Sequence, residues 1–194
     1  MEKIIIPPGI KSVSAQSGLE WNETVSAHEP EQFERIVLPH LDAAYNLARW
    51  LAGNDHDAAD IAQEACARAF RFFDGYRGGD GRSWLLAIVR NTAYSWLKKN
   101  RPSAIVTIHE DELAEIEDHS VAAGAVYRAD TGALRTALET LPLEFREALV
   151  LRELEGLSYK EIAEVAEVPV GTVMSRIARA RRQLQEAFQQ KGAA

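Results

Sequence analysis

The sequence predicts an all-α protein in which an acidic linker joins two small helical domains. Apolar residues recur at spacings of three and four over most of the chain, and the alternation typical of β-strands is absent. Between the helical stretches lies a segment that is rich in acid and poor in aromatic residues. At 194 residues the chain is long enough for two small domains. We therefore expect a flexible lead-in at 1–25, a first helical domain at 26–101, the acidic linker at 102–131 and a second helical domain at 132–190.

Local signals for helix ends divide the first domain into four helices. Gly53 stands where a C-terminal cap is expected, and Asn54 or Asp55 can cap the helix that follows. Four glycines between positions 74 and 81 predict a loop, after which Ser83 is expected to cap the next helix. Pro102 stops that helix, because a proline disfavours a helical residue before it. The expected helices are Glu31–Leu38, His40–Ala52, Asp57–Phe73 and Trp84 to about Asn100.

The last of these helices has two different faces. The apolar face carries Trp84, Ile88, Thr92 and Trp96 and is expected to pack in the core. Trp50, from an earlier helix, is expected to pack there too. The opposite face is expected to be basic and solvated; it carries Arg90, Asn91, Tyr94 and Lys98. Tyr76, in the glycine-rich loop, is expected to be an exposed aromatic residue suited to stacking on nucleic-acid bases.

The second domain begins with two predicted helices, at Gly132–Thr140 and Pro142–Glu155. Proline is favoured in the first turn of a helix, and Gly156 stands just past the end of the second one. Ser158 and Glu161 then form a capping box, in which each side chain binds the other residue's amide. A short helix follows, with Ile162, Ala163 and Val165 facing inward. After a tight break at 167–169, a longer helix runs from Val170 to about Phe188.

A short helix, a tight turn and a longer basic helix are the layout of a helix-turn-helix, whose second helix enters the major groove of DNA. Three apolar residues of the longer helix are expected to pack on the short one: Val173, Ile177 and Leu184. Four others are left on an exposed face that can meet base edges and phosphates: Thr172, Ser175, Arg176 and Arg179. An ordinary helical hairpin with solvated arginines is the alternative interpretation. The short turn and the basic face favour binding of duplex DNA through residues 158–184.

The net charge of −7 argues at first against a nucleic-acid partner, but the charges are unevenly distributed. Residues 81–109 hold five lysines and arginines and no acidic residue, and every charged residue between 168 and 185 is an arginine. Acid is concentrated in the linker instead, at Glu110, Asp111, Glu112, Glu115, Glu117 and Asp118. The chain therefore has two basic surfaces although its net charge is negative.

The single cysteine, Cys66, excludes a disulfide within the chain and fits a reducing compartment. The apolar residues at the N-terminus are too few for a signal peptide, and no apolar run approaches a membrane span. We expect a cytoplasmic protein without membrane insertion. Because Cys66 lies in a helix among Ala65, Ala69 and Phe70, a buried inert thiol is favoured over a redox sensor.

Two sets of motifs resemble one known family. Residues 157–164 (Leu-Ser-Tyr-Lys-Glu-Ile-Ala-Glu) and 170–181 (Val-Gly-Thr-Val-Met-Ser-Arg-Ile-Ala-Arg-Ala-Arg) are similar to region four of bacterial extracytoplasmic-function sigma factors. Residues 60–64 (Asp-Ile-Ala-Gln-Glu), Trp84-Leu85 and Arg90-Asn91 resemble region two of the same family. The two sets follow one another in the same order as in the family, and the number of residues between them is also that of the family. Together they cover about 150 of the 194 residues. The resemblance implies two helical domains and a stress-related role in transcription rather than an enzymatic activity.

The resemblance also implies partners and site residues. RNA polymerase core enzyme and promoter DNA are the implied partners, an anti-sigma factor is a further one, and no cofactor or metal is implied. Asp60, Gln63 and Glu64 match the segment that docks on the clamp helices of polymerase. The residues expected at the melted minus-ten element are Tyr76, Arg77, Ser83, Arg90, Asn91 and Tyr94. Those expected at the minus-thirty-five element are Thr172, Ser175, Arg176 and Arg179. The acidic linker is expected to thread the channels of polymerase.

One departure from the family concerns Glu167, which stands where glycine is common in the turn. If the backbone there is left-handed, a side chain costs about 1 kcal/mol.

Two rival functions remain open. His56, Asp60 and Glu64 lie on one face of one helix and could bind a metal, which would suit a helical metalloenzyme. The other rival is a two-domain helix-turn-helix regulator that binds its operator without polymerase, as a dimer. A partner-binding acidic face explains His56, Asp60 and Glu64 without a metal. The region-two motifs favour a sigma factor over the operator-binding regulator.

Overall fold

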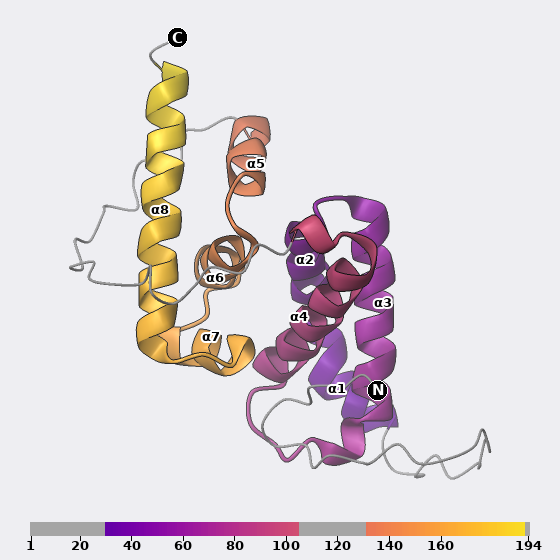
Figure 1. The fold of residues 1–194 in the computed structure, drawn as a ribbon. Helices are drawn as coiled ribbons and strands as arrows, with labels where there is room; N and C mark the ends of the chain where they lie inside the picture. The colour runs from indigo at the N-terminus through magenta and orange to yellow at the C-terminus, as the bar shows by residue number, and fades with distance from the viewer. Residues whose placement is uncertain (1–29, 105–130, 193–194) are drawn as a thin grey trace.

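The computed structural model describes residues 30–104 and 131–192, and all regular structure within these ranges is helical (Figure 1). The predicted all-α class is confirmed for this part of the chain. The lead-in at 1–25 and nearly all of the predicted linker lie outside the described residues. The first half contains α1 (Pro30–Val37), α2 (Leu41–Ala52), α3 (Asp55–Arg71) and α4 (Gly81–Asn100), with short 3₁₀ turns at Leu38–His40, Phe73–Gly75 and Pro102–Ala104. The second half contains α5 (Thr131–Glu139), α6 (Leu143–Glu153), α7 (Tyr159–Ala166) and α8 (Val170–Gly192).

In the first half, α2, α3 and α4 pack against one another and α1 closes one end (Figure 1). The apolar residues at helical spacing form the core, as expected: Leu47, Ile61, Leu85, Val89 and Leu97 are almost completely buried. The end of α2 also follows the prediction. Gly53 adopts a left-handed backbone with φ of 79°, and the Asn54 side chain accepts a hydrogen bond from the Asp57 amide at 2.9 Å.

The predicted cap of α4 was wrong. Asp80 caps this helix, because its carboxylate accepts hydrogen bonds from the amides of Arg82 and Ser83 at 3.3 and 2.9 Å. Ser83 lies one turn further in, where its buried hydroxyl donates to the same carboxylate at 2.6 Å. Burial opposes ionisation of Asp80, but the hydrogen bonds from Ser83 and Arg82 lower its pKa below the ordinary value.

In the second half, α6 and α7 pack on α8, with Leu151, Ile162, Val173 and Ile177 among the buried side chains. The capping box is confirmed, since Ser158 and Glu161 each bind the other's amide. Pro142 lies immediately before α6 rather than inside its first turn, and Gly156 follows the helix with φ of 68°. The long helix α8 continues past Phe188, the residue near which the sequence predicted its end.

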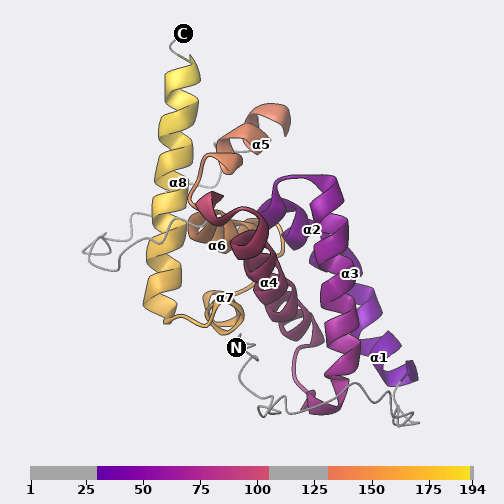
Figure 2. The same cartoon turned by 45° about the vertical axis from the view of Figure 1, so that its right-hand side comes forward.

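The two halves pack directly against each other. Helix α6 lies against α2, and α7 lies against α4; both views show this arrangement (Figure 1, Figure 2). The first helix of the helix-turn-helix therefore rests on the predicted basic helix of the other half. No helix in the described ranges has the length and apolar character needed to cross a bilayer.

Gly81 offers a test of the packing between α1 and α4. A Cβ atom there would lie 2.5 Å from the Ile36 side chain and 2.9 Å from the Ile36 carbonyl oxygen. We expect Gly81→Ala to lower the free energy of unfolding by about 1–3 kcal/mol, because the backbone oxygen can yield only if α1 shifts. Gly171→Ala is the matched control, since nothing lies within 4 Å of its Cβ position. Urea unfolding of both variants measures the effect, and a Gly81→Ala protein as stable as wild type would contradict this packing.

Candidate nucleic-acid interface

The helix-turn-helix is formed by α7, the turn at 167–169 and the N-terminal part of α8. Ile162 and Val165 of α7 are buried, and Val173, Ile177 and Leu184 of α8 are buried as predicted. Glu167 adopts a left-handed backbone with φ of 57° and ψ of 43°, so the condition for strain at this position is met. The amides of Glu167 and Val168 both bind the Ala163 carbonyl, which ends α7 sharply and sets the direction of α8.

The four predicted minus-thirty-five residues occupy the first turns of α8, but they are partly buried rather than freely exposed. Ser175 donates its hydroxyl to the Thr172 carbonyl at 2.9 Å. The Arg176 side chain is only 13% exposed and forms an ion pair with Glu144 of α6 at 3.0 Å. The expectation of a free Arg176 was therefore wrong, because α6 crosses α8 and brings a carboxylate within reach. Arg179 lies one turn further on and is half-exposed.

The predicted basic face of α4 lies against the second half, where α7 packs on α4 and Glu147 of α6 binds its side chains. The expectation of a solvated face was therefore wrong for three of its four residues. The Glu147 carboxylate, 1% exposed, accepts a hydrogen bond from the Arg90 Nε atom on one oxygen. It accepts a second from the Tyr94 hydroxyl on the other oxygen at 2.7 Å. Arg90 also donates to the Asn91 Oδ1 atom at 3.1 Å and lies over the Tyr94 ring. Only Lys98 is exposed.

Burial and charge shift the pKa values of this cluster. Burial, and then the neighbouring Glu147 charge, hold the pKa of Tyr94 well above its ordinary value, so its hydroxyl keeps its proton and donates it. Burial would lower the pKa of Arg90, but the electrostatic interactions with Glu147 and Tyr94 and the hydrogen bond to Glu147 together outweigh burial and raise it. The sequence contains little sign of this contact. Glu147 directly follows Arg146, and only the residues after it, Ala148 to Leu151, form a continuous buried apolar stretch.

The remaining minus-ten candidates lie in and after the glycine-rich loop. Tyr76 was expected to be exposed, but its ring stacks on Phe73 and contacts Trp84, with centroid distances of 5.7 and 5.1 Å. Its hydroxyl donates to the Gly79 carbonyl at 2.7 Å, which holds the loop closed. Arg77 is exposed, whereas Ser83 is buried at the start of α4. Trp50, Trp84 and Trp96 pack on the core as expected, each partly buried.

The acidic face of α3 is exposed, as predicted: Asp60, Gln63 and Glu64 all reach solvent. Glu64 pairs with Arg68 at 2.7 Å, and the His56 Nδ1 atom lies 3.6 Å from an Asp60 oxygen. Within the described ranges no three potential metal-ligating side chains come together. Cys66 is only partly buried, and burial raises the pKa of its thiol, which disfavours the reactive thiolate.

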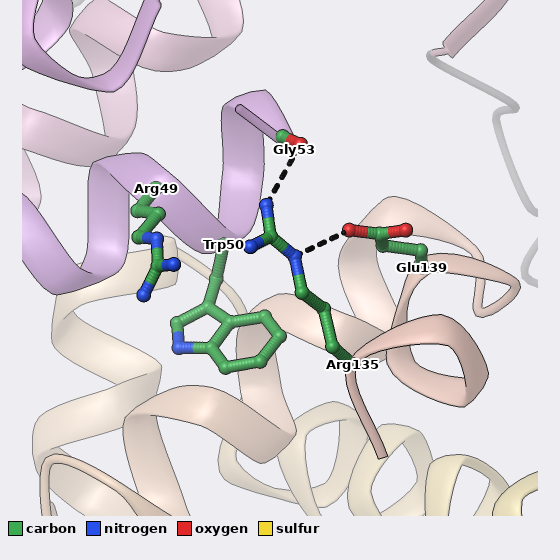
Figure 3. Close-up of a pocket in the computed structure, with 5 residues that line it drawn as sticks. All are labelled: Arg49, Trp50, Gly53, Arg135 and Glu139. Atoms are coloured by element: carbon green, nitrogen blue, oxygen red, sulfur yellow. Dashed lines mark hydrogen bonds and ion pairs between the residues drawn. The ribbon is translucent and has the colours of Figure 1, made fainter. Parts of the chain in front are cut away.

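A shallow pocket lies where the end of α2 meets α5, lined by Arg49, Trp50, Gly53, Arg135 and Glu139 (Figure 3). Arg135 bridges the two halves there: it pairs with Glu139 at 3.0 Å and donates to the Gly53 carbonyl at 3.4 Å. Because its arginines already bind protein groups, the pocket is part of the contact between the halves rather than an open ligand site.

Comparison with known proteins agrees with the two-part architecture. Residues 36–102 match the family model of sigma-70 region 2, and residues 131–184 match that of sigma-70 region 4. The chain is 38% identical over 157 residues to the ECF RNA polymerase sigma factor SigE of Mycolicibacterium smegmatis, a match that covers 79% of this chain but only 60% of that one. It is 35% identical over 176 residues to the RNA polymerase sigma-H factor of Pseudomonas aeruginosa, covering 86% and 91% of the two chains.

A solved structure with a similar fold contains the sigma factor RpoE from Bartonella quintana in complex with the anti-sigma factor NepR. The TM-score is 0.65 at 28% sequence identity, and the match covers 82% of this chain and 98% of that one. The likeness therefore includes both halves.

The strained turn yields a test of the helix-turn-helix geometry. Glycine adopts a left-handed backbone without a steric penalty, so we expect Glu167→Gly to raise the free energy of unfolding by about 1 kcal/mol. The control is Glu164→Gly, an exposed position within α7, which should lower it by about 1 kcal/mol. Thermal and urea unfolding distinguish the two variants. If both substitutions destabilise alike, the backbone at Glu167 is not left-handed.

Proposed function

Because the chain belongs to the extracytoplasmic-function family of RNA polymerase sigma factors, we propose that it binds RNA polymerase core enzyme and directs promoter recognition and melting. The observation that carries this proposal is the presence of both sigma regions in one chain, the second ending in a complete helix-turn-helix. An operator-binding regulator has no need of a region-two domain, so that alternative is disfavoured. The protein acts by binding, and polymerase supplies the chemistry in the cytoplasm.

We assign polymerase docking to the exposed face of α3 that carries Asp60, Gln63 and Glu64. Helix α3 packs on the core through its opposite face, so these exposed polar side chains are available to a partner. The face is acidic, which suits a basic docking surface on the clamp helices.

DNA contacts are divided between the halves. In the first half, Tyr76, Arg77 and Ser83 of the loop region and Arg90, Asn91 and Tyr94 of α4 are assigned to the melted minus-ten element. In the second half, the first turns of α8 are assigned to the minus-thirty-five element, through Thr172, Ser175, Arg176 and Arg179. The linker at 102–131 is assigned to the channels of polymerase. An anti-sigma factor is the further partner we propose, since the similar RpoE chain was solved with one.

Titration against core polymerase tests the docking surface and the proposed function together. We expect wild type to bind core enzyme and to start transcription at discrete promoters. Asp60→Ala with Glu64→Ala should weaken core binding at least about tenfold, because the loss of two interface charges weakens steering and contact. The control is Glu31→Ala with Glu34→Ala, which removes two exposed carboxylates from α1. Failure of wild type to bind core enzyme rejects the function, whereas equal binding by both variants rejects only the assigned surface.

Transcription from promoters with randomised minus-thirty-five elements tests the roles of the arginines of α8. A guanidinium that forks onto a guanine adds about 1–3 kcal/mol of discrimination at one base pair. We expect Arg176→Ala to relax preference at one position, and Arg179→Ala to weaken all promoters alike and reduce the salt dependence. Arg182→Ala, at an exposed site further along α8, serves as control. A uniform loss with unchanged preference in Arg176→Ala would contradict base reading by this residue.

A further inference from the structure

The first two turns of α8 expose apolar side chains more fully than polar ones. Val170 and Met174 are each 40% exposed, and they are among the few large hydrophobic side chains that the described residues leave in solvent. Gly171 lies between them, with nothing within 4 Å of its Cβ position. Arg176, in contrast, is only 13% exposed. The side chains that a partner meets first at this end of α8 are therefore apolar.

Val170, Met174 and Ala178 follow one another at intervals of four residues, and Ala178 is partly exposed. Residues four apart share one face of an α-helix and lie about 6 Å apart along its axis. We call these three residues the apolar stripe. A single exposed apolar residue needs no explanation, but a row of them on one helix face indicates a contact surface. The stripe offers no strong hydrogen-bond donor or acceptor, so it recognises its partner by apolar contact.

The charges around the apolar stripe favour DNA as its partner. Every charged residue between 168 and 185 is an arginine. Arg179 directly follows the stripe and is partly exposed, and Arg182 is exposed one turn past Ala178. A surface whose charges are all positive attracts the phosphates of a duplex. The stripe also lies at the start of the second helix of a helix-turn-helix, the end that meets base edges in the major groove.

An apolar side chain can identify one base in the major groove. Thymine presents its 5-methyl group there, whereas the other three bases carry no methyl group. Met174 has the longest side chain of the apolar stripe, and methionine is unbranched and flexible, so it can adjust to a methyl group at the floor of the groove. The 6 Å between Val170 and Met174 corresponds to about two base pairs, which are 3.4 Å apart.

We propose that the apolar stripe reads thymine methyl groups in the minus-thirty-five element, with Met174 determining specificity at one A·T base pair. The proposal rests on the proposed function and adds a base preference to it. The arginines of α8 bind phosphate and guanine, as assigned above, and the stripe selects an A·T pair beside them. Val170 reaches the groove about two base pairs away from Met174.

Replacing thymine by deoxyuridine tests the proposal, because it removes the 5-methyl group and leaves the pairing with adenine unchanged. The DNA carries the minus-thirty-five element that wild type selects from the randomised promoters, and each thymine on either strand is replaced singly. Fluorescence anisotropy measures binding by holoenzyme assembled from the full-length protein and core polymerase. Each protein is compared on both DNAs, so a variant that weakens polymerase binding changes both affinities alike and leaves their ratio unchanged.

Met174→Ala removes the proposed contact at an exposed position, where the fold does not depend on the side chain. The matched control is Leu154→Ala, which removes a 53% exposed apolar side chain from the same half but outside α8. Circular dichroism checks that both variants are folded.

We expect wild-type holoenzyme to bind about three- to fivefold more weakly when one particular thymine is replaced, because the burial of one methyl group gives a factor of this size. Met174→Ala should bind the thymine and uracil promoters equally, whereas Leu154→Ala should keep the wild-type ratio. Three results would overturn the proposal: an element without any methyl-dependent position, a ratio unchanged in Met174→Ala, or a ratio lost equally in Leu154→Ala. A holoenzyme that binds no promoter rejects the proposed function instead, so the two failures are distinguishable.

Discussion

The carboxylate of Glu147 lies at the junction of the two halves, where Arg90 and the Tyr94 hydroxyl each bind one of its oxygens. A carboxylate that is 1% exposed is tolerable only when its oxygens are satisfied, and only α4 supplies these donors. The Glu147–Arg90 pair lies in the same contact in which α6 packs on α2 and α7 packs on α4. Glu147 therefore stands where the half that carries the helix-turn-helix meets the first half.

The net charge of the chain does not show where its acidic residues lie or what they pair with. Acidic side chains of α6 are paired with arginines on both sides, Glu144 with Arg176 and Glu147 with Arg90. A protein with a net charge of −7 can still bind DNA, because its arginines are concentrated on two surfaces. Glu147 pairs with Arg90 across the contact between the halves, whereas Glu144 pairs with Arg176 within the second half. Charge distribution, rather than total charge, therefore decides whether an acidic chain is compatible with DNA binding.

The helices and their ends could be predicted from the sequence, because caps and apolar periodicity are local signals; Gly53 and the Ser158–Glu161 box are examples. The cap of α4 was misassigned because Asp80 and Ser83 are both residue types that cap helices, and the amide of Ser83 itself donates to the Asp80 carboxylate. Exposure of the site residues could not be predicted. Arg90 binds a residue 57 positions away in the sequence, and Arg176 binds one 32 positions away. Contacts between residues so far apart produce no periodic pattern in the sequence. Glu147 gave no clear indication of its partner, because Glu144 and Arg146 are charged residues of the same helix.

The role of Glu147 in the contact between the halves is tested most directly by a distance measurement in the free protein. Spin labels at Glu34→Cys and Gln183→Cys, in an otherwise wild-type chain with Cys66→Ser, report the distance between the halves. We expect one narrow, short distance distribution, which Glu147→Gln broadens to longer distances because the side chain no longer carries the charge that pairs with Arg90. A distribution that Glu147→Gln leaves unchanged would contradict the central role of this carboxylate.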